Sequence, residues 1–160
     1  MKNNMKNSES RIGNFVRQGE GANAKAVRIS KISPKKIKIE HYGNFYPLAV
    51  LGPLPLNHGW FYQFGFVDGV SAEYDFRKAK GEEFHADFAA KNFGGSVQTL
   101  NCYRSDENGF IYLAIGEFKI AKILFVHELQ NWYYLLSGDE LKTRDEKDRD
   151  LERFYQECKT

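Results

Sequence analysis

Short runs in which apolar and polar residues alternate occupy the chain between residues 11 and 52. The pattern is clearest where Ile37 and Ile39 alternate with Lys36 and Lys38, and a period of two is typical of a strand with one buried face. Glycine, proline and asparagine separate the runs, which are residues 11–17, 26–32, 36–41 and 45–51. Short strands at a spacing of about ten residues predict a small antiparallel sheet, and we expect an SH3-like β-barrel over residues 11–52.

A cluster of aromatic residues follows this β module. Asn57 is a suitable helix N-cap, because its side-chain oxygen can accept a backbone N–H of the first turn. Trp60, Phe61 and Phe64 have helical spacing, and Gly65 suits the left-handed position at which helices end. We expect a helix of about two turns that closes one end of a sheet.

Four further strands are predicted between residues 70 and 125. They are the runs 70–77, 97–104, 110–115 and 118–125. Asn108-Gly109, between the second and third of these runs, is a strong hairpin signal. Phe84 and Phe88 lie four residues apart and favour a short helix within residues 81–95. The runs together predict a second antiparallel sheet.

The stretch VHELQNWYYLLSGDEL, residues 126–141, has the most regular pattern in the chain. Its large apolar residues recur at i, i+3, i+7 and i+10 on one face of a helix, and they are Val126, Leu129, Tyr133 and Leu136. Glu128 and Gln130 fall outside this stripe, and Gly138 marks the predicted helix end. We expect helix 126–137 to cover the second sheet, so that the fold is α+β and mainly antiparallel β.

The C-terminal residues 142–160 are dense in charges of both signs and follow an α+β core over residues 53–141. A last helix is predicted from about Asp148. Its thin apolar stripe supplies the candidate partner-binding residues, which are Leu151, Phe154 and Tyr155. Packing of this segment on its own domain and packing on a partner both remain open.

The composition is that of a globular protein with one domain, or one domain and a small appendage. The chain has 160 residues, of which 42% are hydrophobic and 28% are charged. The polar residues 1–10 predict a disordered tail and contain no signal-peptide pattern. No apolar run approaches the roughly 20 residues of a membrane helix. Two widely separated cysteines, Cys102 and Cys158, indicate neither a disulfide framework nor a zinc site, so we expect a cytoplasmic protein.

Positive charge is concentrated near the N-terminus. Residues 1–40 carry ten Lys and Arg against three acids, a net charge of +7, whereas the whole chain has a formal net charge of +2. Such a region attracts phosphates or an acidic partner, or forms a solvated face that acids elsewhere balance. The candidate nucleic-acid-binding residues are Arg17, Lys25, Arg28, Lys31, Lys35, Lys36 and Lys38. Phe15, Tyr42 and Tyr46 are candidates for stacking on bases.

No arrangement of residues predicts catalysis, a bound metal or a cofactor. His85 and Asp87 would share one face of a strand, but no third ligand lies near them in the sequence. Cys102 could form a Cys-His-Asn nucleophile site with His127 and Asn131. We favour the alternative, in which His127 and Asn131 hold the sheet through buried hydrogen bonds. The glycines follow neither a P-loop nor a dinucleotide-binding pattern.

Three segments resemble a group of small uncharacterised proteins encoded by phages and prophages of Bacteroides-type bacteria. RIGNFV at 11–16 is similar to the group's RIGN-V strand, and the segment from PLPL to FGF at 53–66 is similar to its PIPLTEE-LLKFGF helix. Residues 126–141 are similar to its VHQLQNLYFALTGEEL ending. The chain departs from the group at Asn57-His58-Gly59, where the group has Thr-Glu-Glu, and in its charged tail. The resemblance implies a mobile-element setting in a bacterial host cell and no catalytic residues.

These observations predict a non-enzymatic accessory protein of a phage or mobile element that binds a host or phage protein. The small size, the lack of a catalytic cluster, the SH3-like module and the charged C-terminal segment all favour this function. The alternative is a nucleic-acid-binding protein that uses the basic N-terminal β module. The sequence leaves the identity of the partner and the oligomeric state open.

Overall fold

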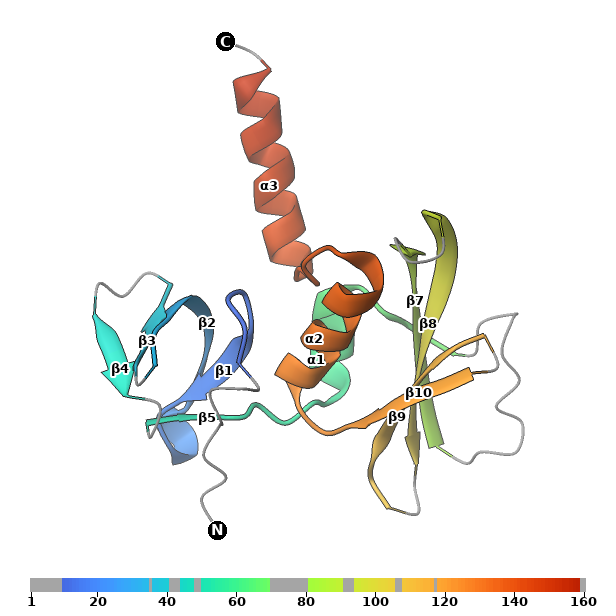
Figure 1. Cartoon of the computed structure of the whole chain (residues 1–160), viewed down its shortest axis with the longest axis horizontal. Coiled ribbons are helices and arrows are strands. Elements are labelled where there is room, and N and C mark those ends of the chain that lie inside the picture. Colours follow the sequence, from blue (N-terminus) through green and yellow to red (C-terminus); the bar gives the residue numbers. More distant parts are fainter. Residues whose placement is uncertain are drawn as a thin grey trace. The chain divides into compact units, whose positions relative to one another are not determined.

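The computed structural model describes residues 10–34, 36–40, 44–47, 50–69, 81–90, 94–105, 108–116 and 118–158. These residues form two antiparallel sheets of five strands each and three α-helices (Figure 1), which confirms the predicted α+β class. The chain divides into two compact units, residues 1–56 with 124–135 and residues 57–123 with 136–160. Each unit contains one of the sheets.

The N-terminal sheet has the strand order β4-β3-β2-β1-β5. Its strands are β1 (Phe15–Gln18), β2 (Lys25–Ile32), β3 (Lys36–Ile39), β4 (Phe45–Pro47) and β5 (Leu51–Gly52), with a 3-10 turn η2 (Gly21–Asn23) after β1. The predicted alternation builds its core, because the apolar residues of one face form a single buried cluster of Val16, Val27, Ile29, Ile37, Ile39 and Leu51. Full burial of such a side chain is worth about 1.5–3 kcal/mol.

The predicted SH3-like barrel is not confirmed. Within the part of the chain that the structure describes, the sheet is open, with β4 and β5 as its two unpaired edges. The run predicted as one strand over residues 45–51 forms two strands, of three residues and two residues. A barrel needs hydrogen bonds between its first and last strands, and two such short edges offer few backbone groups for closure.

Helix α2 (Val126–Ser137) is the predicted amphipathic helix, but residues 126–135 belong to the unit of the N-terminal sheet, whereas the helix was predicted to cover the second sheet. Val126 and Leu129 of the apolar stripe are fully buried, as expected, whereas Tyr133 and Leu136 are half-buried. Gln130 was predicted to lie outside the stripe, but it is fully buried as well. Its side-chain amide accepts the N–H of Phe15 at 2.8 Å and donates to the carbonyl of Gly13 at 3.1 Å. At the start of β1, the Gln130 amide thus forms the hydrogen bonds that the backbone of a neighbouring strand would otherwise form.

The second sheet has the strand order β10-β9-β8-β7-β6. Its strands are β6 (Val67–Asp68), β7 (Gly81–Ala90), β8 (Ser96–Ser105), β9 (Ile111–Ile115) and β10 (Phe118–Ile123). The predicted β8–β9 hairpin is confirmed, with Gly109 in its turn at φ 68°. The short helix predicted around Phe84 and Phe88 is wrong, since both residues lie in β7. A spacing of four residues places two side chains on one face of a strand as well as of a helix. The strand predicted over 70–77 lies outside the described residues.

Helix α1 (His58–Phe64) is the predicted short aromatic helix. The side chain of Asn57 accepts the N–H of Trp60 at 3.3 Å, and Gly65 ends the helix at φ 85°. The ring of Phe61 stacks on the ring of Phe84 in β7, with centroids 4.4 Å apart. This stacking of two buried rings attaches α1 to the second sheet.

Candidate nucleic-acid interface and exposed helix

The candidate interface is the polar face of the N-terminal sheet. Alternation in β1, β2 and β3 turns Arg17, Arg28, Lys36 and Lys38 away from the buried cluster. A register shift between Ile29 and Lys31 places Lys31 directly opposite Lys38, so Lys31 shares this face. We call these five cations, with the two aromatic residues Phe15 and Phe45, the basic face.

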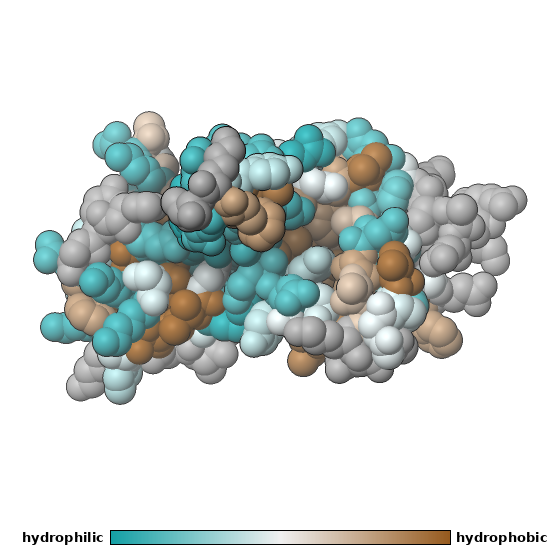
Figure 2. Space-filling view, turned by 90° about the horizontal axis from the view of Figure 1, so that it is seen from above, coloured by the Kyte–Doolittle hydropathy of each residue, from teal (hydrophilic) through white to brown (hydrophobic). Residues whose placement is uncertain are grey.

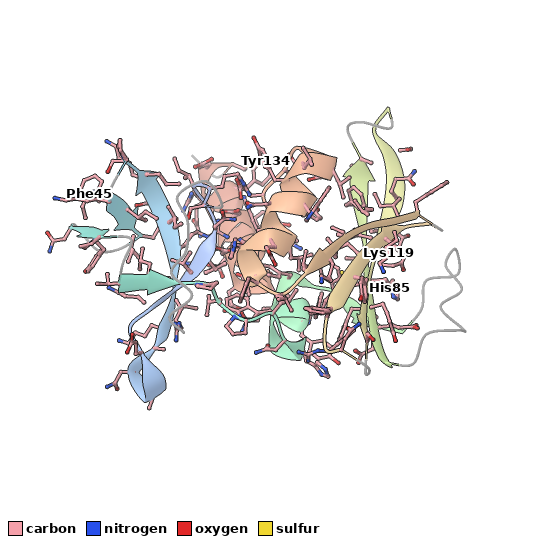
Figure 3. All side chains as sticks on the ribbon, turned by 60° about the horizontal axis from the view of Figure 1, so that its bottom comes forward. Phe45, His85, Lys119 and Tyr134 are labelled. Atoms are coloured by element: carbon pink, nitrogen blue, oxygen red, sulfur yellow. The ribbon has the colours of Figure 1, made fainter. Side chains whose placement is uncertain are left out.

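Aromatic side chains are interleaved with the cations of the basic face. The Arg28 guanidinium lies over the Phe15 ring, 4.8 Å from its centroid. Phe45 of β4 pairs with Lys38 and is 43% exposed. Figure 3 labels this residue on the N-terminal sheet. Phe45 is not among the predicted site residues, because only the register of β3 with β4 shows which face it occupies. Tyr46 pairs with Ile37 and packs against the buried cluster, so it does not belong to the basic face.

Arg17 and Gly52 form a close contact at the β5 edge of the basic face. The two residues are paired in the register of β1 with β5. A Cβ atom at position 52 would lie 2.9 Å from an Nη atom of Arg17 and 3.3 Å from its Nε atom. Glycine at this position therefore lets the guanidinium lie against the backbone of β5. The Nε atom is buried and has no hydrogen-bond partner among the described residues.

One predicted cation, Lys25, does not join the basic face. Lys25 pairs with Gln18, two residues along β2 from Val27, and so lies on the opposite side of the sheet. Lys35 and the predicted stacking residue Tyr42 lie outside the described residues. Glu40 borders the face, since its backbone N–H donates to the carbonyl of Arg28 at 2.9 Å. The five cations give the face a net positive charge beside this acid.

Helix α3 (Arg144–Glu157) carries the candidate partner-binding residues. It begins before the predicted start near Asp148, because Thr143 and Glu146 form a capping box. The Glu146 N–H donates to the Thr143 hydroxyl at 3.3 Å, and the Thr143 N–H donates to the Glu146 carboxylate at 2.7 Å. The apolar stripe is open to solvent: the exposed fractions of its three side chains are 53% for Leu151, 59% for Phe154 and 57% for Tyr155.

The residues of the hypothetical Cys-His-Asn site have other roles. Asn131 accepts the side-chain N–H groups of Arg11 at 3.3 Å and Asn14 at 3.0 Å, which ties α2 to the segment before β1. The ring of His127 is buried and stacks on the ring of Phe125. Burial raises the pKa of the Cys102 thiol well above its usual value, which disfavours the reactive thiolate. Asn131 thus forms hydrogen bonds, as the favoured alternative expects, but they are half-buried and bind the segment before β1 instead of a strand of the sheet.

The polar residues predicted to share a face of β7 are each engaged separately. His85 Nδ1 lies 2.9 Å from the carbonyl oxygen of Gly69, and Figure 3 marks its place on the second sheet. Asp87 accepts the Thr99 hydroxyl at 2.6 Å. Among the residues that the structure describes, no three His, Cys, Asp or Glu side chains are grouped as metal ligands would be.

The two cysteines should react at very different rates with a thiol reagent. In the native protein we expect the exposed Cys158 to be modified rapidly and the buried Cys102 to resist. Reaction with Ellman's reagent, followed before and after addition of denaturant, measures this difference. Rapid modification of both thiols in the native protein would contradict the burial of Cys102, and the Cys158→Ser variant assigns the fast phase.

Comparison with known protein families, with curated proteins and with solved structures finds no match for this chain. Within the described residues, no helix combines the length and the apolar character needed to cross a membrane.

Proposed function

We propose that this protein is a non-enzymatic nucleic-acid-binding protein whose basic face contacts backbone phosphates. The observation that carries this proposal is the direct cross-strand pairing of Lys31 with Lys38. Like charges opposite each other destabilise a sheet, whereas opposite charges there would contribute roughly 0.2–1 kcal/mol. A phosphate bound between two such lysines offsets their repulsion. Binding of a nucleic acid would therefore explain why two lysines stand opposite each other in this sheet.

The aromatic residues favour a single strand as the ligand. Bases of a single strand can stack on exposed rings, and each stack is worth about 1–3 kcal/mol. Phe45 is exposed on the basic face, next to Lys38 in the register of β3 with β4. A duplex keeps its bases paired and offers only phosphates and groove edges to the same surface.

Equilibrium binding tests the proposed function. Fluorescence anisotropy with labelled single-stranded DNA, single-stranded RNA and duplex DNA of about 20 nucleotides should show binding near 50 mM salt. Affinity should fall as salt rises, because phosphate contacts release counterions. We expect single strands to bind more tightly than the duplex. Absence of binding to all three probes at low salt would overturn the proposal.

The contact between Arg17 and Gly52 gives a second, independent prediction. Gly52→Ala should displace the flexible guanidinium from β5 and weaken single-strand binding by about tenfold, the value of one charge-assisted hydrogen bond. Stability should change little, since the backbone of Gly52 is not in the left-handed region and the clash is with a side-chain end. Anisotropy and thermal unfolding measure the two effects. Affinity equal to that of the unchanged protein would remove Arg17 from the interface.

A protein-binding accessory role in a phage or prophage is the second candidate function. The resemblance to phage and prophage proteins supports the setting in a bacterial host cell. The observation that favours a protein partner is the solvent exposure of the three apolar side chains of α3. An exposed apolar patch that polar residues surround is typical of an interaction site.

A further inference from the structure

The first half of α3 is attached to its own unit, whereas the second half is not covered. Lys147 Nζ donates to the carbonyl of Phe64 at 3.4 Å, at the end of α1. Lys142 forms an ion pair of 2.6 Å with Asp150. Every residue from 151 to 158 is exposed, and Figure 1 shows this end of α3 extending away from α1. The helix is thus held at its start and presents its last two turns to solvent.

The exposed turns carry one apolar stripe. Leu151, Phe154, Tyr155 and Cys158 follow the spacing i, i+3, i+4 and i+7, which places them on one face at 3.6 residues per turn. Figure 2 looks from the side to which this end of the helix points, and on this face hydrophobic surface, in brown, lies among hydrophilic surface, in teal. Single exposed apolar residues are common on protein surfaces, but three large apolar side chains in one stripe form a contiguous patch.

Acidic residues border the stripe on both sides. At 100° per residue, Asp148 and Glu152 lie along one side of the stripe, and Asp150 and Glu157 lie along the other. Asp150 is already paired with Lys142, and this hydrogen bond lowers the pKa of its carboxyl group. The arginines Arg149 and Arg153 lie on the opposite side of the helix. Asp148 and Glu152 therefore make one edge of the stripe negative, and Glu157 adds a negative charge to the other edge, where Lys142 neutralises Asp150.

We propose that α3 docks in an apolar groove with a Lys/Arg-rich rim on a partner protein, an inference that rests on the second candidate function. Apolar anchors at i, i+3 and i+4 match the helix-in-groove mode of recognition. The charge pattern argues against a second copy of α3 as the occupant, because acidic edges would face acidic edges in parallel and antiparallel pairs alike. Three large side chains bury a small area, so the complex is expected to be transient.

A designed groove tests this inference with the full-length protein. The probe is a helical hairpin with a leucine-lined groove, made in three versions whose rim positions are Lys, Gln or Glu. We expect affinity to fall in the order Lys, Gln, Glu, with about a tenfold difference between the first and the last in low salt. Isothermal titration calorimetry measures each affinity.

Matched variants distinguish the failure of this inference from failure of the function on which it rests. Leu151→Ser with Phe154→Ser should abolish binding to the Lys version, whereas Arg149→Ser with Arg153→Ser should retain it. Equal affinity for all three rims would be consistent with a helix that binds proteins, but it would contradict the proposal that the partner's rim is rich in Lys and Arg. Binding that survives loss of Leu151 and Phe154, no binding to any version, or dimerisation through α3 in sedimentation would overturn the docking role. Nucleic-acid binding should be unchanged in the Leu151/Phe154 variant, which keeps the two functions separate.

Discussion

Leu129→Ala is expected to lower the free energy of unfolding by about 2–5 kcal/mol, the range for truncation of a large buried aliphatic side chain. Leu129 has no exposed surface and lies one residue before Gln130, whose amide completes the edge of β1. The cavity left by truncation would thus lie where α2 is attached to the N-terminal sheet. A loss of this size is a large part of the roughly 5–15 kcal/mol that stabilise an ordinary domain.

The chain provides a matched control and a local probe for this measurement. Leu135→Ala removes the same atoms from the same helix at a position that is 61% exposed, and it should change stability by less than about 0.5 kcal/mol. The two tryptophans report the two units separately, because Trp132 lies in α2 and Trp60 in α1. Urea unfolding of single-tryptophan variants should show the loss first in the Trp132 signal. Equal midpoints for Leu129→Ala and Leu135→Ala would contradict the core assignment.

The polar part of the α2 attachment could not be predicted from periodicity. Val126 and Leu129 follow the helical stripe, and both are buried as expected. Gln130 lies next to that stripe, and its burial depends on backbone groups of Gly13 and Phe15, more than a hundred residues away in sequence. Glutamine is mostly exposed in proteins, so a hydrophobic pattern places Gln130 at the surface and contains no sign of its long-range hydrogen bonds.

The remaining differences between expectation and structure also have physical causes. The spacing of Phe84 and Phe88 fits a strand and a helix equally well. The segment is a strand because it pairs with β8 along its whole length. The capping-box spacing of Thr143 and Glu146 marks the true start of α3, whereas the apolar stripe alone places the start near Asp148. Closure of a barrel depends on edge pairing, which short alternating runs do not specify.

The candidate site was predicted in part. Alternation correctly placed Arg28, Lys36 and Lys38 opposite apolar neighbours, because a strand has a period of two. The position of Lys31 depends on the register shift after Ile29, and the membership of Phe45 depends on the register of β3 with β4. The register is set by the pairing between strands and cannot be read from the sequence. The sequence therefore identifies the cations but not how they are arranged in the interface.

Lys31→Glu is expected to weaken single-strand binding by at least about tenfold, the loss of one phosphate contact and its replacement by repulsion. The same change should raise stability by roughly 0.2–1 kcal/mol, because the new carboxylate would stand opposite Lys38 in the register of β2 with β3. A variant that loses affinity but gains stability identifies a residue that serves binding although it destabilises the sheet. Anisotropy and thermal unfolding of the same preparation measure both quantities.

Lys25→Glu is the matched control for this experiment. Lys25 is exposed on the same strand, and its replacement changes the net charge by the same amount, but its register with Gln18 places it on the other side of the sheet. If the basic face binds the phosphates, Lys25→Glu should keep most of the affinity and most of the salt dependence, whereas Lys31→Glu loses both. Equal losses in the two variants would show that net charge, and not the Lys31–Lys38 pair, drives binding. Such a result would move the interface away from the polar face of the N-terminal sheet, since a local contact cannot be felt equally on both of its sides.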